Sequence, residues 1–234
     1  MNTTVTVAVL LIALPIAFNL VFAALAATFD YPSILRLPSD EVLARFRAGG
    51  TRLVMLWWVL AMTTVLLAPV AVLLSIAMVG ASGTVRTVAA VLGVLAALAS
   101  FLGLIRWPFL VPYLARVAGD PEATPARREA VDVVFQSFNR YLGVAVGEHL
   151  GYLLTGAWSA CVGIAIAEST VVPRWIGIVG LVVGGLLVLC SFGFVGPFEP
   201  RGWKRAGTLT PVVRIAWSAW LVAVGTALLV HASR

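Results

Sequence analysis

Six stretches of this chain are apolar over about 20 residues or more, the length that a helix needs to cross a ~30 Å hydrocarbon core. They run approximately through residues 4–27, 53–79, 87–115, 142–167, 175–198 and 209–231. In lipid every backbone polar group must bond within the protein, and a helix satisfies its own groups. The pattern therefore predicts an all-α fold, a polytopic bundle of six transmembrane helices that forms one membrane domain over residues 1–234.

The composition supports a large lipid-facing surface. Hydrophobic residues make up 61% of the chain and charged residues only 11%. A soluble domain carries about 25% charged residues, so this surface cannot face water on all sides. We expect a multi-pass protein of the cell membrane that contacts the lipid bilayer directly.

The basic residues are distributed unevenly along the chain. Of the 16 lysines and arginines, 13 lie in or beside the loops after the first, third and fifth apolar stretches. The other three are Arg86, Arg174 and Arg234. Because cytoplasmic loops carry the excess of basic residues, these three loops are predicted to be cytoplasmic and both termini to be outside. We expect the basic loops to bind anionic lipid at the cytoplasmic face, and their dispersed arrangement argues against a nucleic-acid partner.

The first of these loops contains a pattern typical of a short interfacial helix. Ser39 is placed to cap the helix, and two acidic residues follow in its first turn. Val42, Leu43 and Phe46 then share one side, which would lie on the membrane surface. We expect this amphipathic helix to end at Gly49-Gly50.

Several prolines mark expected helix boundaries or kinks. Thr124-Pro125 reads as the cap and first residue of a helix that continues through Arg140 into the fourth span. Thr210-Pro211 is expected to open the sixth span in the same way. Four prolines inside the spans are expected to kink or loosen them, namely Pro15, Pro69, Pro108 and Pro112.

Two pairs of glycines have the spacing that lets helices approach closely. Gly147 and Gly151 lie in the fourth span, and Gly180 and Gly184 lie in the fifth. Such pairs serve helix packing in membranes. Packing within one chain is favoured here, and a homo-oligomer remains open.

Four polar residues fall at a similar depth inside the predicted spans. They are Arg106, Glu148, His149 and Asn19. Because ionisable residues in a membrane are costly, they suggest a functional site. Arg106 and Glu148 are predicted to form an ion pair, and the four residues are candidates for binding a small molecule. The competing interpretation is that they only hold the helices in register.

Other kinds of site lack their usual residues. The chain has two histidines and neither the zinc-protease nor the serine-hydrolase motif, so no metal, cofactor or catalytic residue is predicted. Cys161 and Cys190 are expected at different depths and therefore unbonded. Trp107 and Trp217 fall near mid-depth, where core packing is favoured over lining a cavity.

Three functions remain open at this point. The leading hypothesis is a small transporter or ligand-binding membrane protein with an intramembrane polar pocket. The alternative is a non-catalytic scaffold or regulatory partner protein. A weaker alternative is an intramembrane enzyme that acts on a lipid or isoprenoid.

Two short motifs resemble a known family. They are GEHLGYLL at residues 147–154 and PRWIG at residues 173–177, and the stretch Asp30-Tyr31-Pro32 fits the same pattern. The chain resembles an uncharacterised bacterial membrane-protein family, domain-of-unknown-function family 4386, over most of its length. The resemblance implies a multi-span helical fold, and it implies no activity and no catalytic residues.

Overall fold

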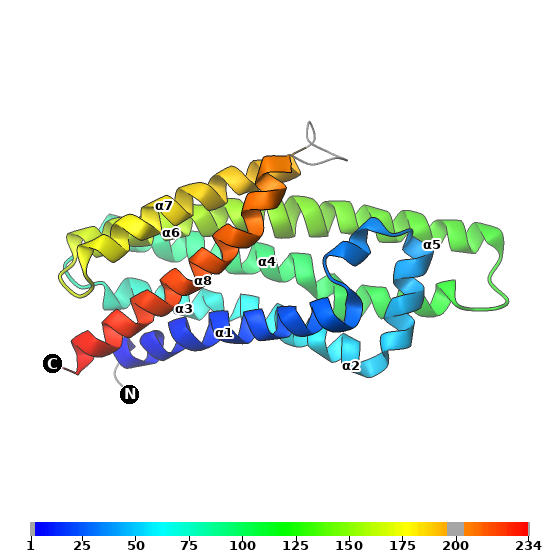
Figure 1. Cartoon of the computed structure of the whole chain (residues 1–234), viewed down its shortest axis with the longest axis horizontal. Coiled ribbons are helices and arrows are strands. Elements are labelled where there is room, and N and C mark those ends of the chain that lie inside the picture. Colours follow the sequence, from blue (N-terminus) through cyan, green and yellow to red (C-terminus); the bar gives the residue numbers. More distant parts are fainter. Residues whose placement is uncertain (1–2, 196–203, 234) are drawn as a thin grey trace.

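The computed structural model describes residues 3–195 and 204–233, and all of its regular elements in these ranges are helical (Figure 1). The elements are α1 (Thr3–Phe29), η1 (Ser33–Arg36), α2 (Ser39–Val65), α3 (Leu67–Ala77), α4 (Gly83–Ala118), α5 (Pro125–Phe138), η2 (Asn139–Leu150), α6 (Gly151–Glu168), α7 (Arg174–Ser191), η3 (Phe192–Phe194) and α8 (Lys204–Ala232). Six helical stretches are long and apolar enough to cross a membrane. The predicted all-α fold with six spans is therefore confirmed, and the chain is a multi-pass membrane protein.

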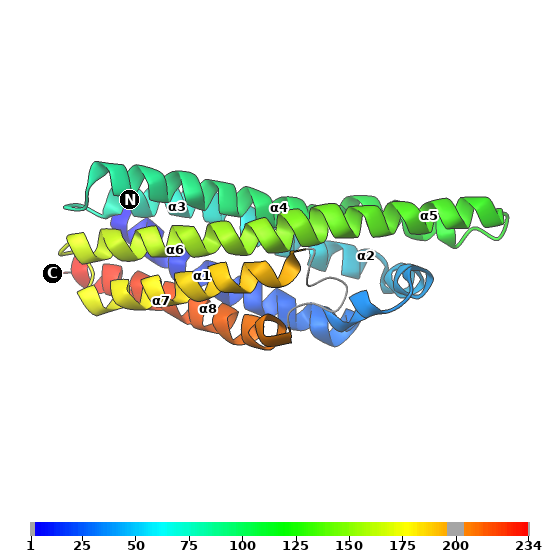
Figure 2. The same cartoon turned by 90° about the horizontal axis from the view of Figure 1, so that it is seen from above.

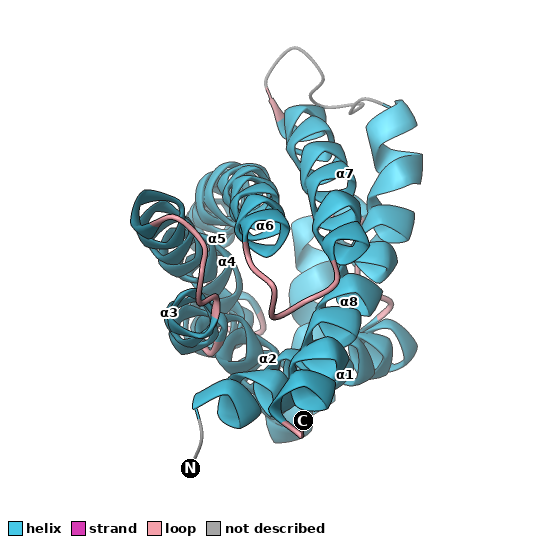
Figure 3. Ribbon diagram, turned by 90° about the vertical axis from the view of Figure 1, so that its left-hand side faces the viewer, coloured by secondary structure: helices cyan, strands magenta, loops and turns pink. Residues whose placement is uncertain are grey.

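The termini and the long loops lie at opposite ends of the bundle. Both termini lie at one end, whereas the segment after α1 and the α4–α5 connection lie at the other (Figure 1). Figure 3, viewed from the terminal end, shows α6 between α4 and α7, and α6 contacts both of these helices. The first two loops predicted to be cytoplasmic thus share one end, while their side of the membrane remains a prediction; the third falls largely on residues 196–203, outside the described residues.

The second span is broken where proline was expected to disturb it. α2 ends at Val65, and α3 begins at Leu67. Pro69 has no N–H to give to the Val65 carbonyl, so the regular helical bond at this point is lost. The predicted kink is confirmed for Pro69, whereas α1 continues through Pro15 and α4 continues through Pro108 and Pro112 without a break.

The fourth span belongs to a continuous helical stretch of 44 residues, Pro125–Glu168, which is roughly 60 Å long. Figure 2 shows it as a rod that extends beyond most of the bundle. The Thr124 hydroxyl accepts a hydrogen bond from the Arg127 N–H at 3.3 Å, so the predicted cap is confirmed. Sequence reasoning missed the π-helical conformation of its middle part, Asn139–Leu150.

The helix predicted in the first loop exists as the first part of α2, but it packs differently from the expectation. Gly50 has φ of 56° and separates it from the rest of α2. Val42, Leu43 and Phe46 are 1–2% exposed, inside an aromatic core. The apolar side therefore packs against the protein and not against lipid. Ser39 is no cap either, because its hydroxyl accepts a hydrogen bond from the Gln136 amide at 2.7 Å.

The boundaries of the last two spans also differ from the predictions. α8 begins at Lys204, and Pro211 lies inside it, so the predicted opening at Thr210-Pro211 is wrong. The Thr210 hydroxyl instead donates to the Ala206 carbonyl of the preceding turn at 2.7 Å. α7 ends at Ser191, and residues 196–198 of the predicted fifth span lie outside the described residues, as do Arg201 and Arg234.

Two apolar cores fill the two ends of the bundle. The core near the termini includes Leu11, Trp158 and Trp220. The core near the long loops includes Trp57 and Trp107. Along α1, α4 and the fourth span, the predicted polar residues fall between the parts that enter these two cores, which places a polar layer in the middle of the molecule.

Candidate functional site

Several polar side chains gather in this middle layer. We call them the polar cluster, and its members are Tyr31, Arg106, Asn139, Glu148, Tyr152 and Arg214. They come from the segment between α1 and α2, from α4, η2 and α6, and from α8. Segments far apart in the sequence therefore build the cluster.

Arg106 is bound by neutral groups. Its guanidinium donates to the Gly103 carbonyl and, at 2.8 Å, to Oδ1 of Asn139. It also lies 5.4 Å from the ring centroid of Trp107, a position in which an aromatic face attracts a cation. Arg106 is only 9% exposed, so these contacts replace most of its hydration.

The close approach of α4 to η2 depends on glycine. A Cβ atom at Gly103 would lie 2.4 Å from Cα of Gly147, and one at Gly143 would lie 2.5 Å from Nη2 of Arg106. The absent side chains let the two backbones touch and let the guanidinium lie against η2. The Gly147–Gly151 and Gly180–Gly184 pairs pack within the chain, against α4, α6 and α8, as the favoured interpretation predicted.

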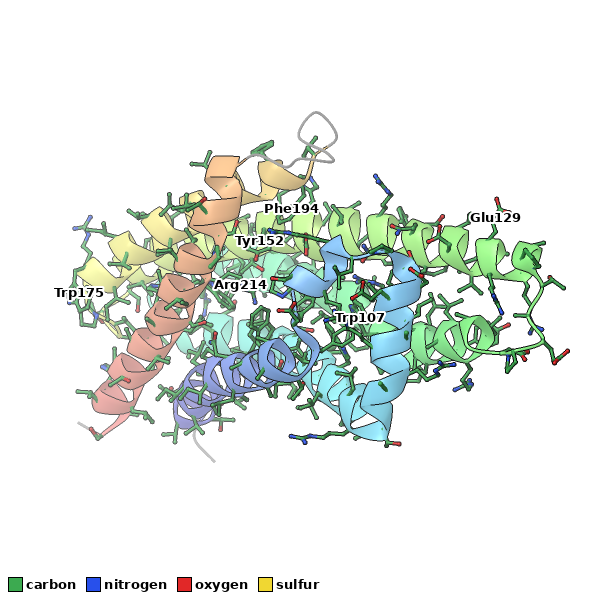
Figure 4. All side chains as sticks on the ribbon, turned by 45° about the vertical axis from the view of Figure 1, so that its right-hand side comes forward. Trp107, Glu129, Tyr152, Trp175, Phe194 and Arg214 are labelled. Atoms are coloured by element: carbon green, nitrogen blue, oxygen red, sulfur yellow. The ribbon has the colours of Figure 1, made fainter. Side chains whose placement is uncertain are left out.

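Arg214 lies on the α8 side of the cluster. Its guanidinium is 4.6 Å from the ring centroid of Phe18 and 5.4 Å from that of Tyr152. It donates a long hydrogen bond of 3.5 Å to the Tyr152 hydroxyl. Tyr152 stacks on Phe194 with a centroid distance of 5.7 Å. Figure 4 shows Arg214, Tyr152 and Phe194 together near the middle of the molecule, with Trp175 and Glu129 at opposite ends.

Glu148 lies between these groups without touching either arginine. The residue is half-buried, and its carboxylate interacts electrostatically with Arg106 and Arg214. Among the residues that the structure describes, no side chain forms an ion pair or hydrogen bond with this carboxylate. The predicted ion pair is therefore wrong, because the Arg106 guanidinium is turned toward Asn139 and Gly103.

Tyr31 brings a phenol to the same charges. Its ring contacts those of Trp57 and Phe22 at centroid distances of 4.8 and 5.5 Å. Burial raises the pKa of Tyr31 above its usual range, and the nearby Glu148 carboxylate raises this pKa further, whereas Arg106 lowers it. The phenol therefore interacts with all three charged groups of the cluster, Arg106, Glu148 and Arg214.

His149 and Asn19 point elsewhere. Nδ1 of His149 lies 2.9 Å from the carbonyl oxygen of Ser191 on α7. The Asn19 amide donates to the Pro15 carbonyl at 2.7 Å and to the Ser218 hydroxyl at 3.0 Å, which links α1 to α8. Of the four predicted binding residues, the structure brings together Arg106 and Glu148, and it places the other two beside the cluster with partners of their own.

Sequence reasoning missed four members of the cluster: Tyr31, Asn139, Tyr152 and Arg214. Arg214 was assigned to the basic cytoplasmic side, although it lies five residues inside the predicted sixth span at 209–231. That position could have identified Arg214 as a site residue from the sequence, because a cation inside a span normally has a specific partner. Tyr31 lies in a loop, and no local pattern places it near Glu148.

Two pockets in the described part of the chain lie away from Glu148. The larger has a volume of about 460 Å³ and lies between α2, α4 and α5, with Ser39, Arg128 and Asp132 in its wall. The smaller has about 190 Å³ and is lined by Gly49 and Arg52. Neither adjoins the polar cluster.

The remaining predicted groups are structural in this arrangement. Trp107 is fully buried and stacks on Trp57 at 4.4 Å, so core packing is confirmed for it. Trp217 is partly buried and donates to the Ser159 hydroxyl at 2.9 Å. The described parts of the chain contain no group of three histidine, cysteine or acidic side chains that could hold a metal ion, and the two cysteines are free thiols.

Comparison with known proteins gives one match. No curated protein and no solved structure is significantly similar to this chain. A family model described as "Domain of unknown function (DUF4386)" matches residues 6–225 and includes every member of the polar cluster. Because the match covers nearly the whole chain, the protein belongs to this family, DUF4386.

Proposed function

We propose that this membrane protein is a small ligand-binding protein or transporter of the cell membrane, and that it binds a small polar molecule at the polar cluster. The supporting observation is Glu148, a half-buried residue inside the bundle whose carboxylate has no direct partner among the described residues. An ion at such a depth costs at least about 2.5–3.5 kcal/mol on insertion scales unless other groups stabilise it. A bound molecule would supply the missing contact.

The backbone around Glu148 supports the same interpretation. η2 is π-helical over 12 residues, and it carries Asn139, Glu148 and His149. Such departures from α-helical geometry occur often at functional sites. At membrane depth, irregular backbone is tolerated where it is buried in protein or lines a cavity, and transporters place their substrate sites in segments of this kind.

A ligand screen on the purified chain tests this function. Small cations, zwitterions, neutral molecules and anions are added in turn, and the unfolding temperature is measured. We expect one class to raise it in the wild-type protein, and we expect the size of this rise at a given pH to differ in Glu148→Gln. Arg127→Gln is the matched control, because Arg127 is exposed on α5 and its nearest carboxylate oxygen is 3.9 Å away on Asp120.

Access to the site is tested separately by cysteine labelling. Glu148→Cys is made in a chain that carries Cys161→Ala and Cys190→Ala, and it is treated with a small water-soluble thiol reagent in membranes. Labelling that a bound ligand slows is the expected result. An unlabelled thiol, together with a screen in which no class binds, would contradict the proposal.

A second candidate is a regulatory partner protein, and one observation favours it. The projecting α5 and the start of η2 carry exposed apolar side chains, with Val133 at 58% and Tyr141 at 69% exposure. Val133→Ser with Tyr141→Ser should then abolish the cellular effect of the protein and leave ligand binding intact. Loss of ligand binding in this variant would speak against a separate partner surface.

We also infer that the basic end of the bundle binds anionic lipid. The support is the concentration of arginines in the loops at that end. Native mass spectrometry in mixed phosphatidylglycerol and phosphatidylcholine should show retention of the anionic lipid. Equal retention of both lipids would contradict this inference.

A further inference from the structure

We propose that the ligand of the polar cluster is a small organic anion whose acidic group binds between Arg106 and Arg214, and that Glu148 takes up a proton when the anion binds. This inference rests on the proposed function, because it names the ligand class for the same site. The chemistry is that of a carboxylate or a phosphate monoester attached to an apolar or aromatic body.

The charges of the site favour an anion. Arg106 and Arg214 are permanent cations, because a guanidinium does not lose its proton in proteins. Glu148 lies on the same continuous helical stretch, between Asn139, which bonds Arg106, and Tyr152, which bonds Arg214. The cluster therefore has an excess of one positive charge when Glu148 is ionised, and of two when it is protonated. A ligand of opposite charge balances this excess inside the bundle.

Both guanidinium groups keep donors for a ligand. A guanidinium has five N–H donors. Among the described residues, Arg106 donates to the Gly103 carbonyl and to Asn139. Arg214 donates only the long bond to the Tyr152 hydroxyl. These partners are neutral, and neither guanidinium forms an ion pair with a described residue, so the remaining donors suit the oxygens of a carboxylate or phosphate.

Aromatic rings lie beside both arginines. Arg106 lies over Trp107, and Arg214 lies over Phe18 and Tyr152. Tyr152 in turn stacks on Phe194. An acidic group between the arginines would therefore have aromatic rings next to it, which suits a ligand with an apolar or aromatic body.

Proton uptake by Glu148 is expected because an anion bound between the arginines would lie next to its carboxylate. Two anions side by side in a medium of low polarity repel each other, and the repulsion favours protonation of one of them. A protonated Glu148 can instead donate a hydrogen bond to the ligand. In the balanced reaction, the anion and one proton from water join the site, the carboxylate becomes a carboxyl group, and no covalent bond changes in the ligand.

Other titratable groups near Glu148 could also contribute to the pH dependence of anion binding. Arg106 faces it from α4, Arg214 from α8, Tyr152 from α6, and Tyr31 from the segment before α2. His149 is next to it on η2 and points to α7, where Cys190 interacts with Tyr152. A pH effect assigned to Glu148 must therefore vanish in Glu148→Gln and persist in His149→Gln.

The experiment is calorimetric titration of the full chain in lipid nanodiscs. The probes are benzoate, phenyl phosphate, neutral benzamide and cationic benzylammonium. We expect the two anions to bind, and their relative affinities identify the preferred acidic group. Affinity should rise by up to about tenfold per unit fall in pH while Glu148 titrates, since one proton is taken up per anion. The difference in binding enthalpy between two buffers of different ionisation enthalpy gives the number of protons taken up per bound anion.

The variants separate the two parts of the inference. Arg214→Gln should weaken binding of the anions by tenfold or more, and Arg127→Gln should leave it unchanged. Arg106→Gln repeats the test on α4, and Arg214→Gln remains decisive if Arg106→Gln does not fold. Glu148→Gln should still bind both anions, and its affinity for benzoate, which stays ionised near neutral pH, should be independent of pH with no proton uptake.

Two results would overturn the inference. One is that neither anion binds the folded wild-type protein at millimolar concentration. The other is that benzylammonium or benzamide binds instead, in a manner that depends on Glu148. The second result would leave the proposed ligand-binding function standing, whereas that function fails only if the wider screen and the Glu148→Cys labelling both fail.

Discussion

A single arginine shows how charge is held inside this bundle. Arg106 is 9% exposed, and its guanidinium is bound by an amide, a backbone carbonyl and an aromatic face. Hydrogen bonds that involve a charged group contribute about 1.5–3 kcal/mol each. Neutral partners therefore stabilise the cation while leaving its charge available to a ligand.

Arg106 and Asn139 should be energetically coupled. We expect Arg106→Ala and Asn139→Ala to destabilise the protein non-additively, with a coupling energy of about 0.5–3 kcal/mol, because each change removes the same 2.8 Å hydrogen bond. The double-mutant cycle is measured by unfolding in mixed micelles. The parallel cycle of Arg106→Ala with Glu148→Ala should give a smaller coupling, and a larger one would indicate a direct ion pair.

Tyr31 should make stability sensitive to alkaline pH. Because the folded protein holds the phenol proton more tightly than the unfolded chain does, the contribution of Tyr31 is fully present below its ordinary pKa of 10.0 and is lost as pH rises above that value. The loss is at most about 1.4 kcal/mol per pH unit for one proton. Tyr31→Phe should flatten the alkaline limb of the stability curve.

The control for Tyr31 is Tyr113→Phe. Tyr113 is 54% exposed on α4, so this change should leave the alkaline limb as it is in the wild-type protein. Equal curves for the two variants would show that Tyr31 is not surrounded by protein in the folded state.

At the level of elements, contact between α4 and η2 determines where the site forms. Gly103 and Gly147 bring the two backbones together, and the same contact places Arg106 beside Asn139. The π-helical conformation of η2 lies along this contact. Helix packing and site geometry are therefore parts of one arrangement.

Alanine at Gly103 should disrupt that arrangement. Its Cβ would lie 2.4 Å from Cα of Gly147, a backbone atom that cannot rotate away. We expect a loss of about 1–3 kcal/mol, the usual cost of overpacking, measured as a lower unfolding temperature in detergent. Gly185→Ala is the matched control, since no atom lies within 4 Å of its added Cβ. The control should be slightly stabilising, because alanine favours a helix by up to about 1 kcal/mol over glycine.

At the scale of the whole molecule, six spans place both termini at the same end, opposite the arginine-rich loops. The roughly 60 Å length of Pro125–Glu168 exceeds the ~30 Å core of a bilayer, so part of this stretch must project from the membrane. The projecting part contains α5, at the end that the charge bias assigns to the cytoplasm.

Fusions to alkaline phosphatase test the orientation in a bacterial host. A fusion after Arg234 should be active, because the positive-inside rule puts that end outside. A fusion after Gly49, in the basic first loop, should be inactive. The reverse pattern would overturn the orientation, and inactivity at both positions would contradict the number of spans.

The sequence by itself determined the features that depend on local composition. The six spans follow from runs of apolar residues. The cap at Thr124 and the break before Pro69 follow from what one residue does to its neighbouring backbone bonds. The depth of Arg106 and Glu148 followed from counting residues along a helix, which is why the two were expected in one layer.

Only the tertiary structure decided which side chains meet in that layer. Residues at equal depth can face different neighbours, because rotation of a helix about its axis and contacts between distant segments set the direction of each side chain. For this reason Arg106 contacts Asn139 in place of Glu148, and Ser39 bonds to Gln136 instead of capping its helix. Arg214 enters the cluster for the same reason: α8 packs against α1 and α7, and this brings it to Phe18 and Tyr152.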